Sequence, residues 1–388
     1  MKSFLSFFVL FCFIQLNSQE LIKAKVLDES NQPIESVYVY WNSNQSGVVS
    51  NPDGEFQLSL SSEVDSVAFD HYEYEFKKIA VQDLMKNPVV KLEKFSIVLN
   101  EALILNKKGD EVLNDIVSAS KIKLDKSLLV NTFSREFISV NDEFTQYSDG
   151  LLDYYIKRKS GKSDVYVLES RNFNLKQSEE ETDVLSISSP FDIGDAISSA
   201  FKFKQIEEIL KKRELYTFQI SEFQDSEENL LRRIEISPKE NAKELLREGW
   251  VVYDVNSNLI LDYFLKASPE TIQHSKLYNF LIAKVKINDF NGRFNFRLEN
   301  GDYRLVFRRI YFDTYIKSGK KIDDNYQFTS DFVVIGYTEN AEPPAGLKKY
   351  RKRNLFERGT DYKTEYWKNI NAITPTENEQ SLIDSLQK

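Results

Sequence analysis

The sequence of 388 residues contains one cysteine, Cys12, and two histidines, His71 and His274. With so few thiol and imidazole groups, a His/Cys metal site is close to excluded. A Ser-His-Asp arrangement would have to recruit one of the two histidines, and neither lies in a recognisable nucleophile context. No G-x-G-x-x-G, phosphate-cradling GKS/T loop, H-E-x-x-H or G-x-S-x-G motif occurs. The sequence therefore predicts no metal site, no cofactor and no catalytic residues.

Glycine and proline are also scarce, with 13 and 9 residues, whereas the chain contains 28 Phe, 20 Tyr and 3 Trp. Aromatic residues are enriched in strands, and few turn-forming residues leave little room for a loop-rich scaffold. The composition therefore favours long β-strands. The length suggests roughly two domains.

The first 18 residues have the pattern of a secretory signal peptide. Lys2 is followed by an apolar run from Phe4 to Leu16, which is too short to span a bilayer, and then by a plausible cleavage site before Gln19. The alternative is a buried N-terminal strand or helix. A lipid-attachment cysteine normally follows a small residue at the cleavage site, but Cys12 follows Phe11 and lies inside the apolar run. We therefore expect an exported protein without a lipid anchor. An exported chain without cysteine after cleavage points to a bacterial envelope, in the periplasm or associated with the outer membrane or cell surface.

The formal net charge of −9 makes the chain acidic, which bears on nucleic acid as a partner. An acidic chain repels polyanions, so nucleic acid is an unlikely partner. No segment after the signal approaches the roughly 20 apolar residues of a membrane helix, so no transmembrane span is expected.

Residues 19–97 alternate between short strands and turns. The stretch "GVVSNPDGEFQLSL" contains Asn51, Asp53 and Gly54, which could begin a calcium loop or form a tight turn. A calcium loop needs oxygen ligands downstream, but Phe56, Leu58 and Leu60 alternate there as in a strand. The pattern predicts a turn between two strands.

This stretch also resembles a known module. Asp28 with Pro33-Ile34, then Gly47 through Asp53-Gly54-Glu55-Phe56, and the strand "FDHY" are similar to the carboxypeptidase-regulatory-like domain. That family is a transthyretin-like β-sandwich common at the N-termini of exported Bacteroidetes proteins. His71 departs from it, because the family usually has a small glycine there. The resemblance implies a structural or interaction module without catalytic residues.

Residues 98–345 read as an antiparallel β domain with helices. Asp110 can cap a helix through Leu124, with Val112, Leu113, Ile116, Val117 and Ile122 close to one face. Residues 192–212 have a second helical pattern. The candidate strands, joined mostly by short polar turns, are Thr132–Val140, Phe144–Lys159, Asp164–Ser170, Leu215–Ser221, Leu230–Ile236, Gly249–Asp254, Asn258–Ala267, Phe280–Asn288, Arg293–Glu299, Tyr303–Ile316 and Tyr326–Thr338.

The fold class follows from these patterns: mainly β within an α+β arrangement, with a small sandwich followed by one large curved antiparallel sheet and a few helices on one face. The second region resembles, more weakly, the C-terminal part of an uncharacterised Bacteroidetes family built on the same module. The hairpin "GWVVYDVNSNLIL" is also similar to hairpins of the half-barrel lipoprotein-sorting fold. These resemblances imply architecture and export but no activity.

One set of motifs suggests an enzyme. Ser118 and Lys121 form an S-x-x-K on a predicted helix, while Ser148-Asp149-Gly150 and Lys317-Ser318-Gly319 are similar to S-D-N and K-T-G. This is the order of penicillin-interacting serine enzymes. Gly150 lacks the required amide, and the second motif falls inside a strand pattern. We keep an exported serine hydrolase using Ser118 and Lys121 as the alternative.

Two charged clusters have simple explanations. Asp149 with Asp153, and Glu179 to Glu181 with Asp183, could serve acid/base chemistry, but a solvated loop is the better explanation in a chain with 60 acidic residues. Residues 346–388 form a basic linker and a helical tail. The linker's run of basic residues could contact anionic lipid peripherally, although a solvated linker is favoured. Its basic residues are Lys348, Lys349, Arg351, Lys352 and Arg353.

The sequence as a whole favours a non-enzymatic cell-envelope binding or accessory protein. It would hold an apolar, lipid-like ligand or an envelope protein against a concave β-sheet. A purely structural envelope module is a further alternative.

Overall fold

The structure is a computed structural model. It describes residues 20–41, 46–71, 73–95, 106–159, 163–174, 184–185, 189–225, 229–280, 282–299, 301–319, 322–361 and 373–386. The predicted signal peptide and the acidic run from Glu179 to Asp183 lie outside these residues.

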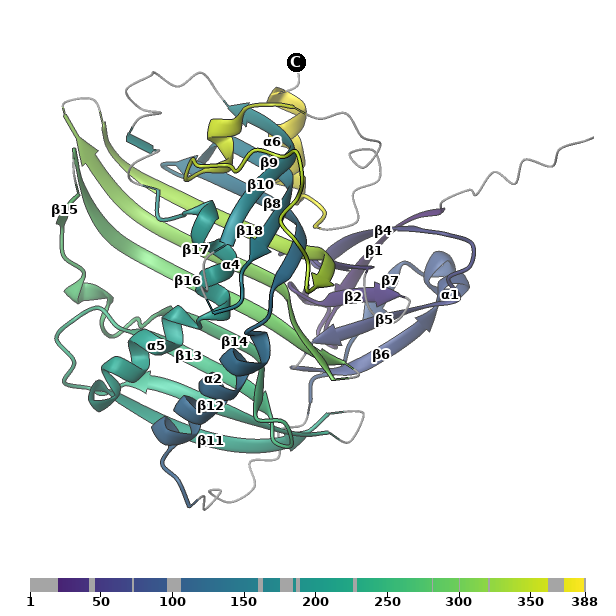
Figure 1. Cartoon of the computed structure of the whole chain (residues 1–388), viewed down its shortest axis with the longest axis horizontal. Coiled ribbons are helices and arrows are strands. Elements are labelled where there is room, and N and C mark those ends of the chain that lie inside the picture. The colour runs from purple at the N-terminus through teal and green to yellow at the C-terminus, as the bar shows by residue number, and fades with distance from the viewer. Residues whose placement is uncertain are drawn as a thin grey trace, which may run out of the picture.

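Residues 20–94 form two small sheets packed face to face, called here the small sandwich (Figure 1). One sheet has the order β4-β1-β7 and the other β3-β2-β5-β6. Alternate apolar residues such as Val26, Val39, Phe56 and Phe69 are buried between them. The elements are β1 (Glu20–Leu27), β2 (Tyr38–Trp41), β3 (Ser46–Val49), β4 (Glu55–Leu60), β5 (Ser66–His71), β6 (Tyr74–Ala80), α1 (Val81–Lys86) and β7 (Val89–Lys91).

The turn between β3 and β4 has the geometry that the sequence predicts. The side-chain Oδ1 of Asn51 accepts hydrogen bonds from the backbone N–H groups of Asp53 and Glu55, at 3.0 and 2.8 Å. Gly54 has a φ of +74°, and a Cβ there would lie 2.3 Å from the carbonyl oxygen of Val26. The Asn51 oxygen therefore serves the backbone of a tight turn, and this position requires glycine.

The rest of the chain is dominated by one 11-stranded antiparallel sheet. Its main path runs β10-β9-β8-β18-β17-β16-β14-β13-β12-β11, and β15 pairs with β16 at the side. The strands are β8 (Leu128–Val140), β9 (Glu143–Ile156), β10 (Ser163–Asn174), β11 (Tyr216–Gln224), β12 (Leu230–Pro238), β13 (Arg247–Asp254), β14 (Leu259–Ala267), β15 (Tyr278–Phe280), β16 (Ala283–Glu299), β17 (Asp302–Ser318) and β18 (Ile322–Glu339).

The observed sheet confirms the predicted fold class, and two details differ from the sequence pattern. The predicted strands Phe280–Asn288 and Arg293–Glu299 are largely one strand, β16, which continues through a register shift between Ile287 and Asp289. In addition, β18 pairs with β8. This pairing joins the meander of β8, β9 and β10 to the meander that runs from β11 to β18, so that the two form one sheet. Both features depend on pairing with distant strands, which local patterns do not specify.

Helices cover one face of the large sheet, which curves around them (Figure 1). They are α2 (Gly109–Leu124), α4 (Ala196–Phe201) and α5 (Lys204–Lys211). Phe203, at a φ of 49°, separates the last two, so the predicted helical region is broken there. The side chains of Leu113, Ile116, Ile197 and Ile206 pack with strand residues in the main hydrophobic core. This face of the sheet is therefore covered by the protein's own side chains.

One residue of α2 does not follow the predicted pattern. Ile122 was expected on the buried face but is 77% exposed. Its neighbours Ser120 and Leu124 are buried at the same end of the helix. Two residues correspond to about 200° around a helix, so Ile122 points away from the core that Ser120 and Leu124 face.

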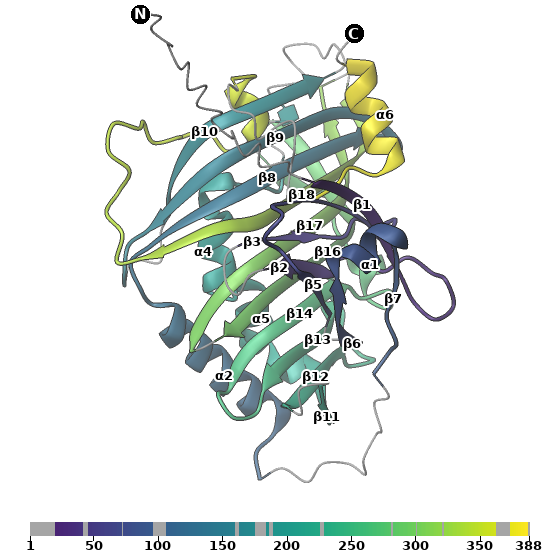
Figure 2. The same cartoon turned by 90° about the vertical axis from the view of Figure 1, so that its right-hand side faces the viewer.

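The opposite face of the sheet carries the small sandwich and the C-terminal segment (Figure 2). Val49 of β3 forms a parallel bridge with Ile373, and both side chains pack with Phe307 and Val333 of the sheet. Further along, Ile383 of α6 (Glu377–Leu386) packs against Phe137. Every helix in the described ranges is too short or too polar to cross a membrane.

Candidate binding site between the small sandwich and the large sheet

The sheet face beneath the small sandwich carries a row of charged side chains. Residues that are direct neighbours in the register of adjacent strands project from the same face. The row crosses six strands from β16 to β10, and most of its neighbouring members have opposite charge. Its members are Arg293, Arg309, Asp331, Arg135, Asp149 and Arg171.

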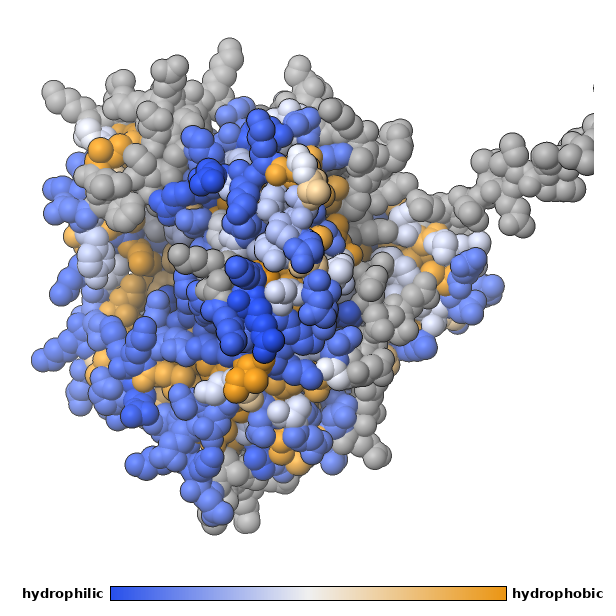
Figure 3. Space-filling view, in the orientation of Figure 1, coloured by the Kyte–Doolittle hydropathy of each residue, from blue (hydrophilic) through white to orange (hydrophobic). Residues whose placement is uncertain are grey.

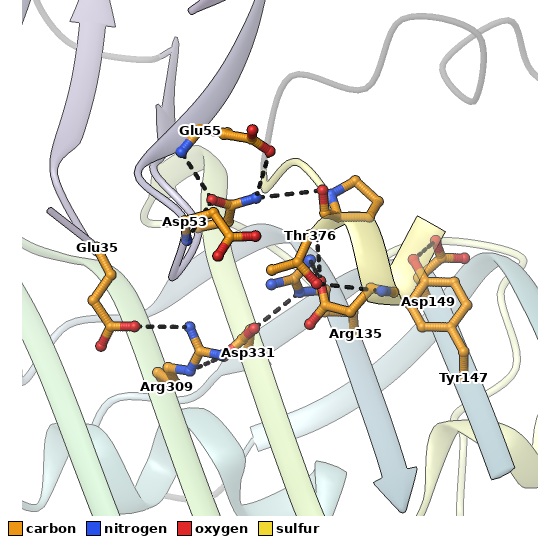
Figure 4. A network of polar contacts seen from close by, with 12 residues as sticks. Glu35, Asp53, Glu55, Arg135, Tyr147, Asp149, Arg309, Asp331 and Thr376 are labelled. Carbon is orange, nitrogen blue, oxygen red and sulfur yellow. Dashed lines mark hydrogen bonds and ion pairs between the residues drawn. The ribbon is translucent and has the colours of Figure 1, made fainter. Parts of the chain in front are cut away.

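Asp331 lies at the centre of this row, between two arginines (Figure 4). The Arg135 Nε donates to its Oδ2 at 2.9 Å, and the Arg309 Nε lies 3.6 Å from its Oδ1. Arg135 is fully buried and also contacts Glu379 of α6 at 3.4 Å. Burial opposes the charge of Arg135, but Glu379 and Asp331 outweigh it and raise its pKa. The C-terminal helix is thus fixed to the sheet by a buried ion pair.

At the far end of the row, Asp149 accepts hydrogen bonds from Arg171 and Tyr147. Burial nevertheless raises the pKa of Asp149. Asp153, which the sequence pattern placed with it, accepts instead from Asn131 at 2.5 Å. The two carboxylates therefore belong to separate structural contacts, and the expectation of a solvated loop is wrong, because both are buried within β9.

Arginines of the large sheet hold the small sandwich in place. The side chains that they contact come from the loop before β2, from β2 itself and from the β5–β6 region. Such a polar contact differs from the apolar cores on either side of it. The pairs are Arg309 with Glu35 at 3.6 Å, Arg297 with Tyr40 at 2.8 Å and Asp70 at 3.5 Å, Arg293 with His71 at 2.9 Å, and Arg233 with Glu73 at 3.3 Å.

His71 is buried at the middle of this contact. Its Nδ1 accepts from the backbone N–H of Glu73 at 3.2 Å, and its Nε2 lies 2.9 Å from the Nη2 of Arg293. The ring meets Tyr74 edge to face, with centroids 5.0 Å apart. Burial first, and then the positive charges of Arg293 and Lys94, hold the pKa of His71 well below its ordinary value. A neutral imidazole is therefore the stable form at this joint.

Next to His71, a cavity of about 190 Å³ lies between the small sandwich and the sheet. Its walls combine aromatic rings with carboxylates, which are the groups that recognise cations through ring faces and ion pairs. Arg297 also lines it and packs over the Tyr40 ring at 3.9 Å. The aromatic members are Tyr40, Tyr74, Phe76, Phe95 and Phe296, and the acidic members are Asp70, Asp225, Asp254 and Asp262.

Asp262 is the most unusual residue of the cavity. Its Oδ2 accepts from Asn295 at 2.8 Å and from Arg293 at 3.3 Å. Its Oδ1 is buried and has no hydrogen-bond partner within the part of the chain that the structure describes. Burial raises the pKa of Asp262 to about 7, although Arg293 and Asn295 oppose the shift. A buried acceptor left without a donor costs roughly 1–3 kcal/mol, so a ligand that supplies one gains from this site.

The residues of the proposed serine-enzyme motifs make separate local contacts. The Ser118 hydroxyl donates to the backbone oxygen of Asn114 at 2.8 Å, and Lys121 pairs with Glu207. Ser148 donates to Asn172 at 2.9 Å, and Lys317 pairs with Asp323. None of these described contacts joins one motif to another. In the part of the chain that the structure describes, no group of three or more His, Cys, Asp or Glu side chains could hold a metal ion.

The basic run of the linker lies along the edge strand β10. Tyr350 donates its backbone N–H to the oxygen of Val165 at 2.7 Å, and Lys349 pairs with Asp164 at 2.6 Å. Lys352 lies 3.5 Å from Glu357, and Arg353 lies 3.8 Å from Asp192. These contacts favour a linker over a free basic arm.

The pattern of the sequence did not point to the cavity. Asp262 stands in the apolar strand "LILDYFL", and Arg293 and Arg297 alternate with aromatic residues in "GRFNFRL". A charged residue in such a strand signals either a solvent-facing side or a buried pair. Only the position of the small sandwich distinguishes the two.

Comparisons with known proteins give only partial superpositions on solved structures. No protein-family model and no curated protein matches the sequence. A lipovitellin structure that describes lipid–protein interactions superposes with a TM-score of 0.26 and 7% identity, over 62% of this chain and 28% of lipovitellin. A DUF1329 family protein from Desulfovibrio piger superposes with a TM-score of 0.25 and 10% identity, over 61% of this chain and 96% of that protein.

Proposed function

We propose that this chain is an exported, non-enzymatic binding protein of the bacterial cell envelope. Its N-terminal sandwich is of the carboxypeptidase-regulatory-like type and serves as one wall of the binding site. The signal-like N-terminus supports export, and the separate contacts of Ser118, Lys121 and Lys317 give the hydrolase alternative no support. The helices cover the inner face of the sheet, which supports a binding site at the sandwich and not against a bare concave surface.

The observation that carries this proposal is Asp262, a residue that lines the 190 Å³ cavity and whose buried Oδ1 has no hydrogen-bond partner among the described residues. The cavity is smaller than the roughly 300 Å³ at which drug-sized sites begin, so it accepts one small group. Four aspartates outnumber Arg297 in its walls and Arg293 beside Asp262, and this balance favours a positive ligand. We infer that it takes an ammonium group, which donates to Asp262 while its alkyl chain packs on the aromatic rings.

Such an ammonium group has two sources: a free small amine, or the lysine side chain of an envelope partner. Calorimetric titration of the full mature chain with butylamine and with an acetylated, amidated Gly-Lys-Gly peptide distinguishes them. Saturable binding of either probe is expected, with no binding of the neutral analogue butanol. Preference for the peptide indicates a partner side chain, and preference for butylamine indicates a free amine.

The test needs matched variants. Asp262→Asn keeps the shape and the contacts to Asn295 and Arg293 but removes the negative charge, and we expect at least about a tenfold loss of affinity. Asp65→Asn changes an exposed aspartate of the small sandwich and leaves affinity unchanged. The proposal would be refuted if Asp262→Asn and the unchanged chain had equal affinities, or if neither butylamine nor the peptide bound.

A further inference from the structure

The exposed Ile122 lies near the C-terminal end of α2, the helix that packs on the face of the large sheet away from the small sandwich (Figure 2). A single exposed apolar side chain is ordinary on a protein surface. This one has an unusual setting, because two hollows of about 850 and 450 Å³ meet at it. Ile122, Asp125 and Lys126 line both of them.

Basic side chains surround this isoleucine. Figure 3 shows a hydrophobic patch over the C-terminal part of α2, directly beside a strongly hydrophilic area. Long basic side chains can lay their alkyl stems on an apolar neighbour while the charged ends reach outward. The basic residues that line the two hollows are Lys121, Lys123, Lys126, Lys157, Arg158, Lys159 and Lys202.

Acidic residues only partly neutralise this surface. Asp125 lies between the hollows and is 4.0 Å from Arg158, while Glu207 pairs with Lys121 and Glu339 pairs with Lys126. Seven basic and three acidic side chains leave a net charge of +4 on this surface. The whole chain has a net charge of −9, so the positive charge is concentrated here against the average.

We propose that this surface, defined by Ile122 and the seven basic residues around it, docks on a bilayer that contains anionic lipids. Basic residues near such a surface are attracted to its negative potential, and an apolar side chain at the centre can enter the boundary between headgroups and acyl chains. The hollows on either side give room for headgroups next to Ile122. The larger hollow and the Asp262 cavity share the lining residue Leu298 but no charged residue, so neither proposal depends on the other.

The geometry distinguishes this surface from the basic run of the linker. In that run, Lys349, Lys352 and Arg353 pair with Asp164, Glu357 and Asp192. Around Ile122, Lys123 and Lys159 make no ion pair with any described residue, and Lys202 interacts with the charge of Asp195 without a direct ion pair. Charge without a local counter-charge is what an anionic surface attracts most strongly.

Co-sedimentation with lipid vesicles tests the proposal on the full mature chain. We expect binding to vesicles of phosphatidylcholine with phosphatidylglycerol, weaker binding as salt increases, and no binding to phosphatidylcholine alone. The triple variant Lys123→Glu, Lys159→Glu, Lys202→Glu should lose at least about tenfold in partitioning. Lys78→Glu, at an exposed position of β6, should bind as the unchanged chain does. Circular dichroism confirms that each variant is folded.

A second readout tests insertion at the residue itself. Ile122→Trp should give an indole emission that shifts to shorter wavelength when anionic vesicles are added. Leu277→Trp, at another exposed apolar position that is 48% accessible, should show no shift. No binding of the unchanged chain to anionic vesicles at low salt, equal binding to neutral vesicles, or equal binding of the triple variant would overturn the proposal.

Discussion

Arg135 and Asp331 lie opposite each other on neighbouring strands, both fully buried, with the Nε of the arginine 2.9 Å from the carboxylate. The pair lies where the large sheet, the small sandwich and the C-terminal helix meet (Figure 4). Its partners Arg309 and Glu379 extend it to Glu35 of the sandwich and to α6. This network connects three parts of the chain that are far apart in sequence.

Replacing Arg135 should therefore destabilise the whole fold. Arg135→Ala leaves Glu379 buried without this positive partner and leaves Asp331 with only the longer contact to Arg309, which costs about 3–5 kcal/mol of unfolding free energy. Urea denaturation measures the loss. Arg351→Ala, at an exposed position of the linker, serves as the control and should change stability by less than about 0.5 kcal/mol. A small effect of Arg135→Ala would contradict the central role of this pair.

Glu379 should control the docking of α6 separately. Its Oε2 contacts Arg135 and also accepts from the backbone N–H of Thr376 at 2.8 Å. In Glu379→Ala, both contacts are lost while the Arg135–Asp331 pair remains. Hydrogen exchange should accelerate in residues 377–386 and stay unchanged in the small sandwich. Faster exchange across both regions would show that α6 does not detach alone.

Glu136 should make stability depend on pH. Burial raises its pKa from 4.5 to about 7, against the N–H of Leu355 and the charge of Arg308. The folded protein therefore holds this proton more tightly than the unfolded chain does, and stability is lost as the pH rises from about 4.5 to 7. The contribution is at most about 3 kcal/mol. In Glu136→Gln, the difference in unfolding free energy between pH 5 and pH 8 should shrink; an unchanged difference would contradict the shift.

His71 acts in the opposite direction. Its pKa is lowered in the folded protein, so the unfolded chain binds the proton more readily as the pH falls below the ordinary value of 6.5. Protonation would place an imidazolium against Arg293 and near Lys94, with Glu73 and Asp262 as the nearby acids. The thermal midpoint should therefore fall less between pH 7 and pH 5 in His71→Gln than in the unchanged chain. An equal fall in both proteins would show that His71 does not titrate with unfolding.

Much of the fold could be predicted from local patterns. Alternation in "EFQLSL" and the Pro-Asp-Gly turn predicted β4 and the turn before it, because both depend on neighbouring residues alone. The pairing of β8 with β18 could not, since those strands are nearly 200 residues apart, as Arg135 and Asp331 show. Ile122 fits a helical apolar pattern, but its side chain is exposed because it points away from the core that its neighbours Ser120 and Leu124 face.

The candidate site was harder to predict than the fold. Asp262, Arg293 and His71 belong to three strands, and each alone has an ordinary explanation as a surface or packed residue. Their joint role appears only where the small sandwich lies on the large sheet. A local signal at this joint is His71, which stands where the module that this stretch resembles usually has glycine.

The carboxyl group of Asp262 offers the most direct test of the binding proposal. Its pKa can be followed by carbon-13 NMR of the labelled carboxyl, with and without saturating butylamine or the lysine peptide. A bound ammonium group favours the charged carboxylate, so the pKa should fall from about 7 toward the ordinary value of 3.8, and affinity should increase as the pH rises through 7. A pKa near 7 that stays unchanged at saturating concentrations of both probes would contradict ammonium binding at this cavity.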